Sequence, residues 1–147
     1  MAETAAAREV RVVRDFAAPP ERVFRAWTEP DQVAAWFGPA QVETPRDGVR
    51  IDLRIGGRYE LTMLAPGGRE FAIGYEITAL EPPRLLELRS DPMPAAGMHE
   101  PTVVRITLEP HGKGTRMTLT DGPQPAGSRA GEGWEAAAAK LAALVDD

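Results

Sequence analysis

The hydrophobic pattern of this chain changes period once, and that change constrains the fold more than any other feature. From Val49 to Asp121, apolar and polar residues alternate in short runs that glycine and proline separate, which is typical of half-buried β-strands. Near the C-terminus the apolar residues recur at spacings of three and four, as in an amphipathic helix; they are Trp134, Ala137, Ala138, Leu141, Leu144 and Val145. The pattern predicts a series of antiparallel strands closed by one long helix.

Before this series, the sequence predicts one strand and two short helices. Residues Arg8 to Phe16 alternate in the manner of a strand. Pro19-Pro20-Glu21 and Thr28-Glu29-Pro30-Asp31 each place proline in a first helical turn, with an acidic side chain near the positive end of the helix. Gly38-Pro39 ends the second helix. This order of elements predicts an α+β fold in which the helices cover one side of the sheet.

Glycine and proline mark the turns between the expected strands. Val49 to Ile55 alternates throughout and is expected to form one strand, with a turn at Gly56-Gly57. A second turn is expected at Pro66-Gly67-Gly68, and a break at Glu81-Pro82-Pro83. His111-Gly112-Lys113-Gly114 is expected to join two paired strands as a hairpin.

Length and composition limit the class of protein. A chain of 147 residues suits one domain, which we expect to span residues 1–147. The absence of cysteine excludes disulfides, thiolate metal sites and iron–sulfur clusters, and it suits a reducing cytoplasm. A net charge of −5 opposes binding to nucleic acid or an anionic membrane. The first residues lack the pattern of a signal peptide, and no apolar stretch approaches the ~20 residues of a membrane-spanning helix. We therefore expect a cytoplasmic protein with no nucleic-acid partner and no membrane partner.

The sequence shows no pattern typical of a metal, nucleotide or covalent catalytic site. His99 and His111 lie twelve residues apart without a paired carboxylate motif, so no metal site is expected. The glycines between residues 127 and 133 match neither a dinucleotide fingerprint nor a P-loop. Ser90 and Ser128 lack the context of a nucleophile elbow. We therefore expect no cofactor and assign no catalytic residue.

Five segments, in their order along the chain, resemble one family. They are Ala18–Pro30 with Trp36-Phe37-Gly38-Pro39, Asp52–Tyr59, Glu81–Leu85, Gly114–Leu119 and Gly133-Trp134. The chain resembles the bacterial family named after the activator of the heat-shock-protein-90 ATPase, within the START-like, Bet v-type (SRPBCC) helix-grip superfamily. The resemblance covers nearly the whole chain and implies a curved antiparallel sheet wrapped around the long C-terminal helix, with a cavity between them. That superfamily includes carriers, receptors, aromatases and cyclases, so the resemblance implies no single activity.

The candidate ligand contacts are residues that such a fold would turn toward its cavity. Strand parity places Tyr59 with Met63, and Phe71 with Ile73 and Tyr75, on common faces of the sheet. The alanines of the last helix leave space beside the sheet, although the same pattern also suits close helix–sheet packing. The predicted contacts are Trp36, Phe37, Tyr59, Met63, Phe71, Ile73, Tyr75, His99, Trp134, Ala138 and Leu141.

The leading hypothesis is that a monomer or homodimer binds a small hydrophobic or aromatic molecule, with access through the glycine-rich segment at residues 123–133. One alternative is an enzyme of the cyclase or aromatase type, with an inward Tyr75, His99 or Asp121 as acid or base. It needs two or more ionisable groups that converge inside the cavity. The other alternative is a module that interacts with a chaperone, which needs an exposed apolar patch. Binding without catalysis is the expected function.

Overall fold

The structure is a computed structural model that describes residues 8–92, 100–124 and 128–146. One antiparallel sheet forms the larger layer, with its strands in the order β1-β7-β6-β5-β4-β3-β2. The strands are β1 (Arg8–Phe16), β2 (Val49–Ile51), β3 (Arg58–Leu64), β4 (Glu70–Glu81), β5 (Leu85–Ser90), β6 (Val103–His111) and β7 (Gly114–Gln124). The helices are α2 (Pro20–Thr28), α3 (Pro30–Trp36) and α4 (Ala130–Val145), and the short 3-10 helix η1 (Arg46–Gly48) precedes β2.

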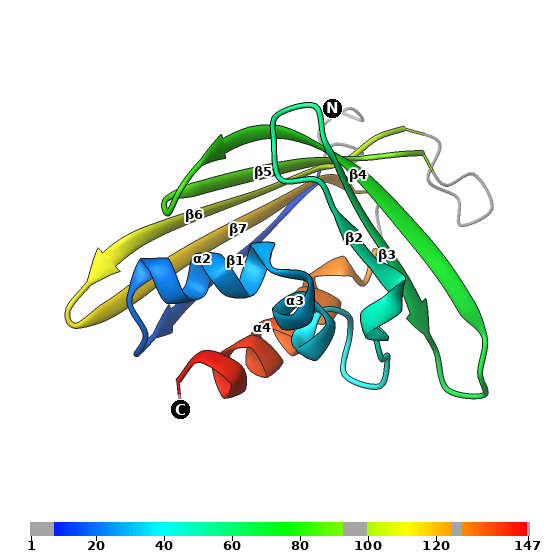
Figure 1. The fold of residues 1–147 in the computed structure, drawn as a ribbon, viewed down its shortest axis with the longest axis horizontal. Coiled ribbons are helices and arrows are strands. Elements are labelled where there is room, and N and C mark those ends of the chain that lie inside the picture. Colours follow the sequence, from blue (N-terminus) through cyan, green and yellow to red (C-terminus); the bar gives the residue numbers. More distant parts are fainter. Residues whose placement is uncertain (1–7, 93–99, 125–127, 147) are drawn as a thin grey trace.

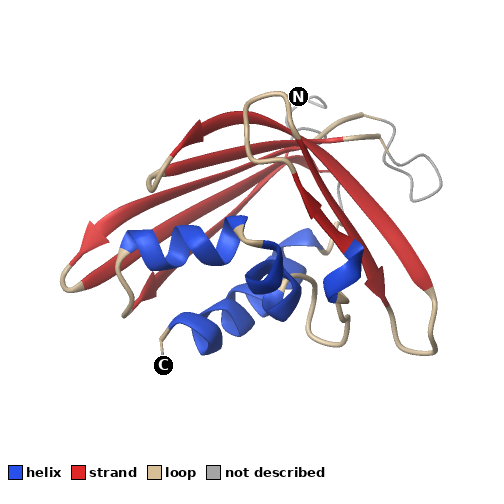
Figure 2. Ribbon diagram, in the orientation of Figure 1, coloured by secondary structure: helices blue, strands red, loops and turns tan. Residues whose placement is uncertain are grey.

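The sheet curves over the helices, and α4 lies within its concave side (Figure 1). Helices and strands are thereby segregated into two layers (Figure 2). The α+β helix-grip fold that the sequence predicts is confirmed. None of the helices in the described ranges is both long enough and apolar enough to span a membrane.

The two short helices form as the proline pattern predicts, with their boundary at Glu29. Its N–H bonds the carbonyl of Arg25 at the end of α2, and its carbonyl accepts from Val33 in α3. Pro30 has no N–H and cannot continue α2, but its fixed φ suits the first turn of α3. The indole Nε1 of Trp36 donates to the Ala26 carbonyl at 2.7 Å, which fixes the angle between the two helices.

The concave face of the sheet carries the buried side chains. In β3 every second residue is buried, namely Tyr59, Leu61 and Met63. Their partners across β4 are Tyr75, Ile73 and Phe71, in the same order. Directly opposed residues project to the same face of a sheet, so this face is the one that the sequence alternation predicts.

The strand expected from Val49 to Ile55 is wrong in its second half. β2 ends at Ile51, and Leu53 and Ile55 are 44% and 63% exposed. A tight turn replaces the rest of the strand, because the N–H of Asp52 already bonds the carbonyl of Arg58 at 2.8 Å. A side chain at Gly57 would place its Cβ 2.0 Å from the carbonyl oxygen of Asp52. The turn therefore begins at Asp52, several residues before the Gly56-Gly57 pair at which it was expected.

The segment at residues 123–133, through which the ligand is expected to enter, begins within a strand and ends within a helix. β7 continues to Gln124, and Gly131 and Gly133 lie in the first turns of α4. Residues 125–127, which include Gly127, lie outside the described residues. Leu108 faces Met117 and His111 faces Gly114, so the hairpin that leads into β7 is confirmed.

Candidate functional site

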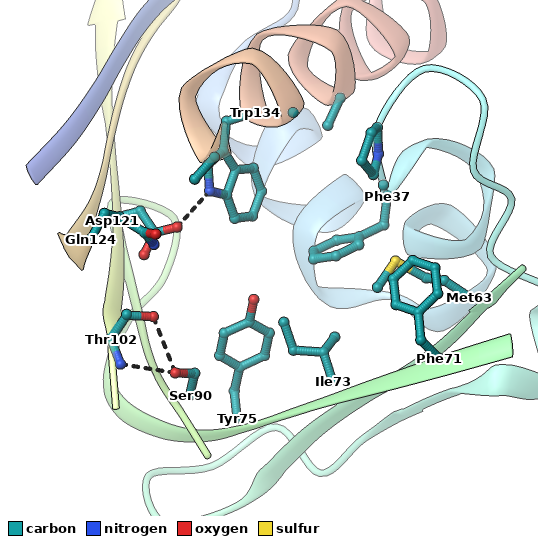
Figure 3. A pocket seen from close by; sticks show the side chains of 15 residues that line it. Phe37, Met63, Phe71, Ile73, Tyr75, Ser90, Thr102, Asp121, Gln124 and Trp134 are labelled. Atoms are coloured by element: carbon teal, nitrogen blue, oxygen red, sulfur yellow. Dashed lines mark hydrogen bonds between the residues drawn. The ribbon is translucent and has the colours of Figure 1, made fainter. Parts of the chain in front are cut away.

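A pocket lies between the concave face of the sheet, the first turns of α4 and the loop after α3 (Figure 3). Its volume is about 300 Å³. The lining residues are Phe37, Gly38, Pro39, Met63, Phe71, Ile73, Tyr75, Ser90, Thr102, Asp121, Gln124, Ala130, Gly133, Trp134 and Ala137. They come from both ends and the middle of the chain, so packing of the helices on the sheet creates the pocket.

Aromatic and aliphatic side chains form most of its wall. Phe37 and Trp134 meet edge to face, with ring centroids 5.6 Å apart and ring planes at 82°. Met63, Phe71 and Ile73 project from β3 and β4 toward them (Figure 3). These side chains offer dispersion contacts and no strong hydrogen-bonding group. Most of the pocket therefore suits an apolar molecule.

The loop after α3 forms one side of the pocket and is held by α4. Lys140 donates hydrogen bonds to the backbone carbonyls of Pro39, at 3.0 Å, and Val42, at 3.2 Å. Burial lowers the pKa of the Lys140 ammonium group. Gly38 has a φ of +107°, a conformation that favours glycine. These features place Phe37, at the end of α3, against the pocket.

The other end of the pocket is polar. Trp134 donates its indole Nε1–H to Oδ2 of Asp121 at 2.8 Å, and the Asp121 side chain is buried. Its Oδ1 makes no hydrogen bond to any described residue. Beside it, Ser90 Oγ accepts from the backbone N–H of Thr102 at 2.9 Å. The hydroxyl of Tyr75 points into the pocket (Figure 3).

Burial sets the ionisation of the two acidic groups at this end. It raises the pKa of the Asp121 carboxyl, while hydrogen bonding from Trp134 and the nearby side chains of Gln124 and Thr102 oppose that shift. Burial also raises the pKa of the Tyr75 phenol, and the charge of Asp121 raises it further. Tyr75 is therefore a neutral hydroxyl, able both to donate and to accept a hydrogen bond.

Comparison with known proteins identifies the family. The sequence model of the family described as "Activator of Hsp90 ATPase homolog 1-like protein" matches residues 17–146. The chain belongs to this family. The matched residues include the two short helices, the sheet from β2 onward and α4. The match confirms the resemblance drawn from five sequence segments.

Solved structures agree with this assignment. A crystal structure of a protein from Chromobacterium violaceum is 26% identical, with a TM-score of 0.81, and the match covers 95% of this chain and 99% of that one. A family protein from Silicibacter pomeroyi is 23% identical, with a TM-score of 0.73 over 93% of this chain and 96% of that one. A solution structure of a family-like protein from Aeromonas hydrophila is 24% identical, with a TM-score of 0.76 over 94% and 92% of the two chains. The last two show the fold alone. A search of proteins with curated functions returns no match.

The helix-grip fold of this family places the sequence-predicted contacts in two groups. Six of them line the pocket: Phe37, Met63, Phe71, Ile73, Tyr75 and Trp134. Four are buried in the core and do not line it: Trp36, Tyr59, Ala138 and Leu141. Tyr59 uses its hydroxyl to bond the carbonyl of Trp27 at 2.7 Å. His99 lies outside the described residues.

At the polar end, Tyr75 is among the predicted ligand contacts, whereas the sequence names Asp121 only as an acid or base in the enzyme alternative. Asp121 has the same strand parity as Met117 and Leu119, and all three are buried, so parity was the available signal for it. Ser90, Thr102 and Gln124 come from three separate strand ends, and their convergence depends on strand pairing. In contrast, the charged side chains on either side of Ser90, Arg89 and Asp91, are exposed. Within the described residues, no group of three or more metal-ligating side chains occurs.

Proposed function

We propose that this protein binds a small hydrophobic or aromatic ligand in the pocket between the sheet and α4. The observation that carries the proposal is the composition of the pocket, which has a long apolar wall and a few polar groups at one end. Sites for small molecules typically combine an apolar lining with a few placed polar groups, in volumes of about 300–1,000 Å³. A volume of about 300 Å³ favours a ligand of one or two rings.

The hydration of the pocket supports occupancy. The pocket is partly open to solvent, so water can enter it in the free protein. Water would find hydrogen-bonding partners at the polar end, near Tyr75 and Asp121, but few along the wall of Phe37 and Met63. An apolar ligand would replace that water with dispersion contacts.

Native mass spectrometry of freshly purified protein tests the proposal. We expect a retained small molecule, or binding of added one- and two-ring hydrocarbons. Ala137→Met would fill the pocket and abolish this binding, because Ala137 lines it. Ala139→Met is the matched control, since Ala139 is exposed on the same helix. Absence of any bound compound in the unaltered protein, or equal binding by the two variants, would contradict the proposal.

A second candidate is an enzyme of the cyclase or aromatase type. The observation in its favour is that two ionisable groups, Tyr75 and Asp121, line the same end of the pocket. A buried carboxylate beside a neutral phenol is suited to proton transfer. Mass analysis of the ligand after incubation separates the candidates, since an enzyme would change the compound and Asp121→Asn would slow that change.

We also propose that the protein acts in the cytoplasm, as a monomer or homodimer. The cysteine-free composition supports the location, because most cytosolic proteins have no disulfide bonds.

A further inference from the structure

The polar end of the pocket holds the carboxyl group of Asp121, and no described lining residue can act as its counterion. Asp121 is 5% exposed, and the groups that bond it are neutral: the indole of Trp134, at 2.8 Å, and the nearby side chains of Gln124 and Thr102. Among the described residues that line the pocket, none is lysine, arginine or histidine. A buried carboxylate is costly unless it is paired and hydrogen-bonded. A positively charged ligand would supply the counterion that the described lining lacks.

The polar end offers hydrogen-bond acceptors to a ligand. The Asp121 carboxylate has capacity beyond the bond from Trp134, because its Oδ1 has no partner among the described residues. The Tyr75 hydroxyl points into the same space (Figure 3). The Ser90 and Thr102 hydroxyls hydrogen-bond each other at 3.1 Å, and Oε1 of Gln124 accepts from the Ser128 hydroxyl at 2.9 Å. An ammonium group carries several N–H donors and no acceptor, so it matches the Asp121 carboxylate better than another carboxylate does.

The aromatic wall suits the same chemistry. Rings of Tyr75, Phe37 and Trp134 lie around the polar end and the space next to it (Figure 3). Faces of aromatic rings attract cations, and this attraction grows when water is excluded. An anion would be repelled by a charged Asp121, because Coulomb interactions are strong where water is scarce.

We infer that the ligand is an amine, with a protonated nitrogen attached to a small aromatic or apolar body, and that Asp121 and Tyr75 hold the nitrogen. This inference rests on the proposed binding function. The hydrocarbon body lies along the wall of Phe37, Met63 and Ile73, and the ammonium group pairs with the carboxylate at the polar end. Ligands with the same body and a carboxylate head are excluded by charge.

Calorimetric titration with three ligands of one shape tests the inference: naphthylmethylamine, naphthylmethanol and naphthoate, all substituted at the same ring position. We expect the amine to bind more tightly than the alcohol by about tenfold or more, the contribution of one charge-assisted hydrogen bond. Naphthoate should bind more weakly than the alcohol. Because the ranking is measured on the unaltered protein, it does not depend on whether a variant folds.

Variants then assign the preference to the carboxylate. Asp121→Asn should remove most of the amine's advantage and leave alcohol affinity within about threefold, since the amide keeps the shape and loses the charge. Glu135→Gln makes the same change of charge at an exposed position on α4 and should leave the ranking unaltered. Equal affinity for amine and alcohol, or a preference for naphthoate, overturns the inference and leaves the proposed function standing. Binding of none of the three overturns both.

Discussion

Trp134 and Asp121 are joined by a hydrogen bond of 2.8 Å from the indole Nε1 to the carboxylate Oδ2, and this bond links α4 to β7 inside the pocket. The hydrogen bond has a structural role and also a role in the chemistry of the pocket. It fixes the start of the helix against the sheet, and it orients a buried carboxylate beside the Tyr75 hydroxyl. Disturbing the pair should therefore alter both stability and ligand preference.

Replacing Trp134 with phenylalanine tests the structural contact. Trp134→Phe keeps an aromatic ring but leaves Oδ2 of Asp121 without its donor, so we expect the free energy of unfolding to fall by about 1–3 kcal/mol. Urea denaturation measures the loss. The same substitution should cost less in an Asp121→Asn background, because the partner is then a neutral amide. Equal losses in both backgrounds would mean that ring packing alone explains the effect.

The raised pKa of Asp121 predicts a pH dependence with a definite sign. In the folded protein the carboxyl holds its proton to a higher pH than in the unfolded chain. Asp121 therefore contributes a loss of stability as pH rises from the ordinary aspartate pKa to the raised folded value. Asp121→Asn abolishes that titration, so its stability relative to the unaltered protein should increase from acidic to neutral pH.

Urea denaturation of both proteins across that range checks this prediction. Comparing the difference between the two proteins removes the contributions of other carboxyls, such as Asp15, whose pKa is lowered by its hydrogen bond with Arg116. A difference in unfolding free energy that stays constant with pH, or that decreases toward neutral pH, would be inconsistent with a buried Asp121.

Trp36 should be a core residue whose loss is severe. It is 1% exposed, packs edge to face on Trp27 with ring centroids 4.5 Å apart, and bonds the Ala26 carbonyl. Trp36→Ala should lower the free energy of unfolding by about 3–5 kcal/mol, because it opens a large cavity between α2 and α3. Thermal and chemical denaturation measure this change. A loss near zero would show that this helix pair does not support the sheet.

Sequence reasoning found the sheet face but could not separate pocket from core. Tyr59 and Met63 alternate identically along β3, yet Met63 lines the pocket and Tyr59 is covered by the helices. The difference depends on which neighbours fill the space above each strand, and that is a property of tertiary packing. At Leu53 and Ile55 the alternation predicts a strand that does not form. The hydrogen bonds around Gly57 make a turn there instead.

The glycines at the start of α4 predict a mobile side to the pocket. Cβ atoms added at Gly131 and Gly133 would lie 3.7 Å from Val10 and 3.6 Å from Pro39, which are ordinary contacts, so alanine fits at both positions. Each glycine lowers helix stability by about 0.5–1 kcal/mol relative to alanine. The double alanine variant should therefore slow exchange of a hydrophobic probe more than it changes equilibrium affinity.

Hydrogen exchange tests this prediction in the ligand-free protein. Amides of residues 130–133 in the first turn of α4 should exchange faster than those of residues 136–144 in its alanine-rich body. Equal protection in the two segments would rule out the start of α4 as the route of access.

The central claim is that a small ligand occupies the pocket beside Trp134, and titration of isotope-labelled protein by two-dimensional NMR tests it most directly. Trp134 lines the pocket, whereas Trp36 is buried outside it with its indole bonded to Ala26. On addition of naphthylmethylamine, the Trp134 indole N–H signal should shift together with the amides of Ile73 and Ala137, and the Trp36 indole signal should stay nearly unchanged. Shifts confined to exposed residues such as Leu53 and Ile55, or none at Trp134, would contradict the account.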